Sequence, residues 1–162
     1  MITATHRAHA VILTSLAMAF ILTIIPLPGW LDPLRPEWVA LGLIYWCMAL
    51  PNRVGVGIAW TTGLFLDVLR GGLLGQHALT LCLIVYIALK FYRRIRVAPL
   101  WQQSVSIFIL MLIHLLLNLW IKGISGQPPH SWDYWFPAFT SMLIWPLCFL
   151  GLRLMRRHFR IT

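Results

Sequence analysis

The stretch GLFLDVLRGGLLG, residues 63–75, decides how this chain is interpreted. It closes an apolar segment, yet it carries Asp67 inside that segment and several glycines directly after it. A charged residue within a membrane-spanning helix is costly, so it faces protein or water and not lipid. The stretch therefore predicts a helix that packs against protein and then turns tightly near the membrane surface.

The composition of the whole chain favours an integral membrane protein. Of its 162 residues, 60% are hydrophobic and 10% are charged, whereas about a quarter of the residues of a soluble domain are charged. No linker or repeat divides the sequence, so we expect a single integral membrane domain over residues 1–162. The three cysteines stand singly in apolar segments, a pattern that indicates neither a zinc site nor disulfides.

Six apolar segments predict an all-α polytopic membrane protein with six transmembrane helices. The candidate spans are residues 8–25, 37–50, 54–69, 73–89, 105–121 and 135–155. The second span is shorter than the roughly 20 residues that cross a bilayer. We expect local thinning of the membrane, or re-entry together with the third span, to accommodate it.

The basic residues predict the orientation of the spans, because lysine and arginine concentrate in cytoplasmic loops. With both termini in the cytoplasm, two expected loops, residues 90–96 and 153–160, lie inside. The cytoplasmic set is Arg7, Arg53, Lys90, Arg93, Arg94, Arg96, Arg153, Arg156, Arg157 and Arg160, against Arg35, Arg70 and Lys122 outside. Topology and attraction to membrane lipid explain the net charge of +9 better than nucleic acid does. A docking surface for a cytoplasmic partner is the alternative use of these clusters.

Small residues in the third span predict close helix packing. Gly55, Ala59 and Gly63 recur at every fourth position and would form one stripe on a helix. Small side chains at this spacing let a second backbone approach closely, which is how membrane helices associate.

Asp67 continues the same stripe into the turn that follows. Gly71 and Gly72 would free the chain to turn sharply, and Gly75 would allow close approach. The carboxylate is expected to accept hydrogen bonds from backbone amides of this turn, or to pair with Arg70 at i+3. The five residues form a candidate structural or partner-binding motif.

The fifth span carries a polar stripe. His114 and Asn118 lie four residues apart on one face, with Lys122 a further four residues on. Such a face should avoid lipid, and Asn118 reaches nearly the depth of Asp67, so the two side chains could pair. The alternative is that His114 and Asn118 only pack and bond to neighbouring backbone.

No catalytic set is visible in the sequence. It lacks a nucleophile-elbow motif, a zinc-protease motif and a phosphate-binding loop, and its polar loop residues are too few for a metal site. We therefore expect no enzyme activity, no metal and no cofactor.

Four stretches resemble the family of the rod shape-determining protein MreD. They are RPEW at 35–38, YWCMALPNRVGVG at 45–57, GLFLDVLRGGLLGQHAL at 63–79 and LWQQS at 100–104. The most specific element is the aspartate followed by Gly71, Leu74 and Gly75. The resemblance extends over nearly the whole chain.

The resemblance implies a non-enzymatic scaffold or regulatory subunit of the machinery that elongates the bacterial cell wall. It implies a multi-pass protein of the inner membrane that binds MreC and, through it, MreB, RodZ and RodA with its transpeptidase. The implied fold resembles the S components of energy-coupling factor transporters.

Two other classes of function remain open from the residues. The same six helices could hold a small molecule for transport, with Asp67, His114 and Asn118 lining a pocket. The first span, however, lacks the Ala-x-x-x-Ala pattern typical of S components within its apolar run. An activity on lipid that uses Asp67 is the third class.

Overall fold

The computed structural model describes residues 2–127 and 129–159, with side chains from Ala8 onward, and this part of the chain is all-helical. The six α-helices are α1 (Ile2–Ile24), α2 (Trp38–Ala49), α3 (Val56–Arg70), α4 (Gln76–Val97), α5 (Leu100–Ile124) and α6 (Phe136–His158). Two short 3-10 helices, η1 (Asp32–Leu34) and η2 (Trp132–Trp135), lie in the longer connections. The predicted all-α fold with six helices is confirmed.

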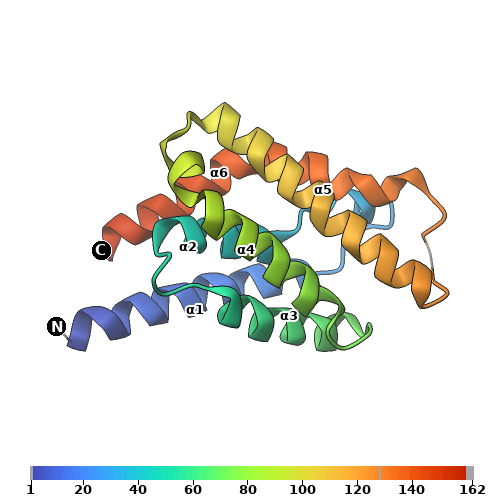
Figure 1. Cartoon of the computed structure of the whole chain (residues 1–162), viewed down its shortest axis with the longest axis horizontal. Coiled ribbons are helices and arrows are strands. Elements are labelled where there is room, and N and C mark those ends of the chain that lie inside the picture. The colour runs from blue at the N-terminus through green and yellow to red at the C-terminus, as the bar shows by residue number, and fades with distance from the viewer. Residues whose placement is uncertain (1, 128, 160–162) are drawn as a thin grey trace.

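Successive helices run in opposite directions, so α1 begins and α6 ends at the same end of the molecule (Figure 1). The short helix α2 packs against α1, α4 and α6. Nearly all of it is buried, including Trp46 and Cys47 at 0% exposure. Because its neighbours cover α2, this helix needs little contact with lipid. A helix of 12 residues is therefore long enough at this place in the fold.

The small-residue stripe is only partly a packing seam. A Cβ atom added to Gly63 would lie 2.3 Å from the Cα of Ala78, so α3 and α4 approach each other closely there. Ala59 is fully buried as well. Gly55 is different, because an added Cβ would meet no atom within 4 Å. The prediction of packing at Gly55 is wrong, since this residue is the N-cap of α3 and has open space where a Cβ would stand.

The expected loop at residues 90–96 is also wrong, because these residues continue α4 to Val97. Lysine and arginine have high helix propensity, so charge alone does not end a helix. The helix ends where Ala98 adopts an extended conformation with ψ of 149°. A residue before proline is disfavoured in the helical region, and Pro99 follows directly. In the same way, α6 continues through its basic residues to His158.

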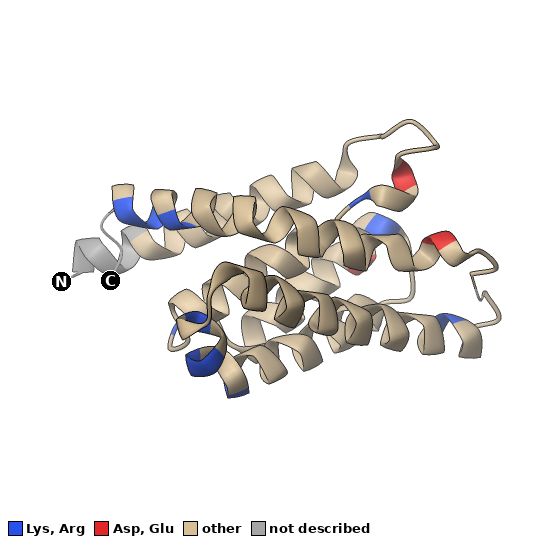
Figure 2. Ribbon diagram, turned by 90° about the horizontal axis from the view of Figure 1, so that it is seen from above, with Lys and Arg blue, Asp and Glu red and all other residues tan. Residues whose placement is uncertain are grey.

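The charged residues separate to the two ends of the molecule (Figure 2). One end, the basic end, is where α4 and α6 finish and α2 connects to α3, and it carries Arg53, Lys90, Arg93, Arg94, Arg96, Arg153, Arg156 and Arg157. The other, the acidic end, is where α3 and α5 finish and α2 begins, and it carries all four acidic residues, Asp32, Glu37, Asp67 and Asp133, together with Arg35, Arg70 and Lys122. Both basic clusters lie at one end because two helices separate them.

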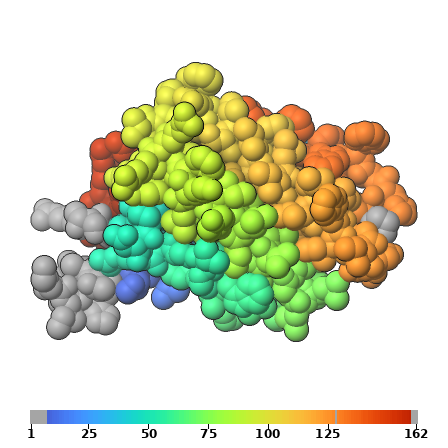
Figure 3. Space-filling view, viewed as in Figure 1, coloured from blue at the N-terminus to red at the C-terminus, as the bar shows by residue number. Residues whose placement is uncertain are grey.

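Large apolar side chains cover the outer faces of the helices. Leu143 of α6 is 75% exposed and Phe65 of α3 is 66% exposed, and Figure 3 shows the face that α3, α4 and α5 form. By length and hydropathy, two segments of the described residues could cross a membrane, Leu100–Ile124 and Trp132–His158, and Ala8–Ile24 is a shorter apolar helix. An apolar exterior of this kind suits a lipid environment.

Candidate functional site at the α3–α4 turn

Asp67 is completely buried and binds the first turn of α4. Its Oδ2 accepts a hydrogen bond from the backbone N–H of Gly75 at 2.8 Å, and its Oδ1 accepts one from the N–H of His77 at 2.8 Å. The first N–H groups of a helix have no partner within the helix, and they attract negative charge. Asp67 of α3 therefore caps α4 from outside, and the expected bonds to backbone amides of the turn are confirmed.

Two glycines shape the turn between these helices. Gly71 has φ of +63° and ends α3, with its N–H directed to the carbonyls of Asp67 and Val68. Gly75 has φ of +97° and is the N-cap of α4, where it offers no side-chain cap of its own. Residues with a Cβ rarely adopt such angles. Gly75 is thus required for its backbone conformation, and the expected close approach is wrong, because an added Cβ would meet nothing within 4 Å.

His77 connects Asp67 to Arg70. Its Nδ1 lies 2.8 Å from Oδ1 of Asp67, and its Nε2 lies 3.1 Å from Nη1 of Arg70. A guanidinium only donates hydrogen bonds, so Nε2 of His77 accepts and the ring proton lies on Nδ1, which donates to Asp67. The histidine therefore serves as a neutral bridge between a carboxylate and a guanidinium.

Arg70 pairs with Glu37, which stands just before α2. Nη2 of Arg70 lies 3.2 Å from Oε2 of Glu37, and the side chain of Glu37 is only 10% exposed. The backbone N–H of Glu37 donates to Oγ of Ser141 in α6 at 3.1 Å. The predicted pairing of Arg70 with Asp67 is wrong, because the carboxylate of Asp67 is directed at the start of α4. The polar cluster of Asp67, His77, Arg70 and Glu37 instead links the α3–α4 turn to α2 and α6.

His114 and Asn118, on the polar stripe of α5, are buried, and Asn118 bonds to α4. Asn118 accepts a hydrogen bond from Nε2 of Gln76 at 3.0 Å and donates to the carbonyl of His114 at 2.9 Å. Both stripe residues are buried, and the ring centroid of His114 lies 6.2 Å from that of His77. The predicted direct pairing of Asn118 with Asp67 is wrong, since Gln76 is its partner at the start of α4. Sequence reasoning did not single out Glu37, Gln76 or His77.

Two cavities flank Arg70 at the acidic end. One has a volume of about 430 Å³ and is lined by Glu37, Arg35 and Tyr134, among others. The other has a volume of about 510 Å³ and is lined by Gly71, Gly72, His77 and Lys122, among others. Among the described residues, no group of three histidine, cysteine or acidic side chains is placed to hold a metal ion. Arg70, Glu37 and His77 mainly use their hydrogen-bonding capacity on one another.

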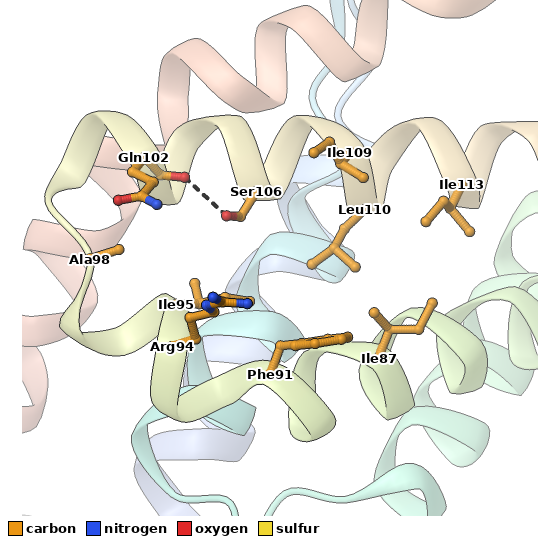
Figure 4. Close-up of a pocket in the computed structure, with 10 residues that line it drawn as sticks. All are labelled: Ile87, Phe91, Arg94, Ile95, Ala98, Gln102, Ser106, Ile109, Leu110 and Ile113. Atoms are coloured by element: carbon orange, nitrogen blue, oxygen red, sulfur yellow. Dashed lines mark hydrogen bonds between the residues drawn. The ribbon is translucent and has the colours of Figure 1, made fainter.

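A separate apolar groove lies between α4 and α5 (Figure 4). Its volume is about 260 Å³, and Phe91 and Ile87 of α4 face Ile109 and Leu110 of α5 across it. None of its lining residues belongs to the polar cluster around Asp67. The groove is therefore a feature of the side of the bundle and not of the candidate site.

The exterior of the helical body is apolar, and its buried polar groups bond one helix to another. These features are typical of a helical membrane protein whose polar groups serve helix packing. The family model of the rod shape-determining protein MreD matches residues 6–155. The rod shape-determining protein MreD of Haemophilus influenzae strain Rd is 35% identical over 150 residues, which is 93% of each chain. The chain belongs to the MreD family. No solved structure matches it, so the likeness to S components remains an expectation.

Proposed function

We propose that this protein is a non-enzymatic scaffold or regulatory subunit of the inner-membrane machinery for cell-wall elongation, and that it maintains rod shape by binding MreC. Membership of the MreD family supports the rod-shape role. Through MreC, the protein would associate with MreB, RodZ and RodA with its transpeptidase. The family relationship favours this role over the small-molecule transport alternative.

The orientation in this proposal follows from the separation of charge. The basic end lies in the cytoplasm, because positively charged residues accumulate on that side of the membrane. Both termini are then cytoplasmic, and the acidic end with the α3–α4 turn faces the periplasm.

The observation that carries the proposed contact is the braced turn at Asp67. Its tip holds Leu73 and Leu74, which are 52% and 73% exposed, while the carboxylate of Asp67 fixes the backbone beneath them. An exposed apolar tip on a preorganised backbone loses little entropy on binding and suits a protein contact. We assign this turn to the contact with MreC.

Copurification of MreC from cells that express both proteins tests the proposal. The variant Leu74→Ser removes apolar contact area at the tip and should lower the MreC recovered per molecule of this protein. Val97→Ser is the matched control, because Val97 is 86% exposed at the basic end. Equal recovery of MreC with wild type and Leu74→Ser would show that the tip is not the contact.

A further inference from the structure

A small pocket at the basic end lies between α2, α4 and α6, remote in the fold from the α3–α4 turn. Its volume is about 180 Å³. Three arginines line it, namely Arg96 in the last turn of α4, and Arg153 and Arg156 on α6. We call it the arginine pocket.

No acidic side chain of the described residues balances the charges in the arginine pocket. All four acidic residues belong to the acidic end. Within the described residues, Arg96, Arg153 and Arg156 make no hydrogen bond or ion pair, and Cζ of Arg153 lies 6.0 Å from the ring centroid of Phe149. Three neighbouring guanidinium groups repel one another. An anion among them would remove that repulsion.

Tyr45 provides a second, independent indication of a ligand. Its ring is held edge-on between Trp46 and Phe149, with centroid distances of 5.3 and 5.7 Å, and the residue is 2% exposed. Its hydroxyl nevertheless has no hydrogen-bond partner among the described residues, although it lines the pocket. The hydroxyl opens onto the pocket, where it lacks the hydrogen-bond partner that a tyrosine usually finds. A bound oxygen atom would supply one.

The remaining wall of the pocket is apolar. Met48 of α2 and Phe149 of α6 line it beside the arginines. These residues stand where α2 and α6 approach the basic end, so the pocket combines a cationic part with an apolar part at the edge of the membrane. A lipid headgroup with its glycerol and upper chain has the same combination.

We propose that the arginine pocket binds the phosphate of an anionic phospholipid. Arginine suits phosphate because its planar fork donates two parallel hydrogen bonds. The phosphate oxygens accept hydrogen bonds from the three guanidinium groups and from the hydroxyl of Tyr45, while Met48 and Phe149 contact the glycerol and the first chain carbons. The pocket would hold one lipid molecule at a defined place, whereas general electrostatic attraction would spread lipid over the whole basic end.

Native mass spectrometry of the full chain in neutral detergent, titrated with dioleoyl phosphatidylglycerol, tests the proposal. Arg153→Gln and Arg96→Gln should each weaken binding about tenfold or more, because each removes a hydrogen bond between charged groups. Arg157→Gln is the matched control, since it removes the same charge from α6 without lining the pocket. It should bind nearly as wild type does.

Two milder variants separate a shaped site from simple charge. Arg153→Lys keeps the charge but loses the fork, and should bind more weakly than wild type. Tyr45→Phe removes a single hydroxyl, keeps the packing, and should also weaken binding. Thermal unfolding without added lipid serves to confirm that each variant is folded.

Three results would overturn the proposal. The first is equal loss in Arg157→Gln and Arg153→Gln, which would show diffuse attraction. The second is unchanged binding in folded Arg153→Gln, Arg96→Gln and Tyr45→Phe. The third is displacement of the lipid by inorganic phosphate at a concentration equal to that of the lipid, which would assign the pocket to a soluble anion.

Discussion

Two nitrogens of His77 bind the same carboxylate oxygen of Asp67: its backbone nitrogen and its Nδ1 each lie 2.8 Å from Oδ1. The other oxygen accepts from the N–H of Gly75 at 2.8 Å. These bonds replace the water that the carboxylate loses on burial, and the helix dipole of α4 adds favourable interaction with its charge. A charge within an apolar segment is tolerated here because the next helix begins against it.

The first prediction concerns the carboxylate of Asp67. Asp67→Asn keeps one acceptor oxygen but turns an NH₂ group toward a backbone N–H, so we expect a loss of about 1–3 kcal/mol in the free energy of unfolding. Asp67→Ala leaves every donor unpaired and should lose more. Thermal unfolding in detergent measures this order, and MreC copurification should follow it at comparable membrane levels. A more stable Ala variant than Asn variant would contradict the capping role.

The second prediction uses the contrast between two glycines of α3. Gly63→Leu should force α3 away from the backbone of Ala78, at an overpacking cost of about 1–3 kcal/mol or more. Gly55→Ala should be tolerated, because an added Cβ there meets nothing within 4 Å. Membrane abundance and complementation of rod shape provide the readout. Normal shape and abundance of Gly63→Leu would refute the seam between α3 and α4.

The third prediction concerns the ion pair between Glu37 and Arg70. A double-mutant cycle with Glu37→Gln and Arg70→Gln should give a coupling energy of about 0.5–1 kcal/mol. The value is modest because the side chain of Arg70 is 33% exposed and solvent screens the pair. Unfolding midpoints of the four proteins supply the cycle. Strictly additive single effects would mean that the pair contributes nothing.

The fourth prediction concerns orientation in the membrane. In a background without Cys47, Cys82 and Cys148, a cysteine at Ser125 should react with a membrane-impermeant reagent added outside the cell. A cysteine at Arg94 should stay unlabelled until the membrane is permeabilised, because the proposed orientation places the basic end inside. Labelling at position 94 from outside would reverse the proposed topology.

Much of this architecture could be predicted from the sequence. Long apolar segments predict helices, and the glycines around Asp67 predict a turn, because both signals act over a few residues. The role of Gly63 was also visible, since small residues at fourfold spacing indicate a seam. Helix ends were less certain, as in α4, where charge in residues 90–96 suggested a loop and Pro99 set the real boundary.

The pairing within the site could not be predicted in the same way. Glu37 reaches Arg70 across 33 residues of sequence, and Gln76 reaches Asn118 across 42. Such partners depend on how helices pack, which no local pattern encodes. The i+3 spacing favours Arg70 as the partner of Asp67, but the amides of α4 compete for the same carboxylate and bind it instead.

Site-specific photocrosslinking tests the central claim most directly, namely that the braced tip of the α3–α4 turn contacts MreC. A benzoylphenylalanine residue is placed at Leu74 in one protein and at Val97 in another, and each is irradiated in growing cells. The account predicts an adduct with MreC, identified by mass spectrometry, from position 74 and none from position 97. An MreC adduct from position 97 alone, or from neither position while MreC still copurifies, would contradict it.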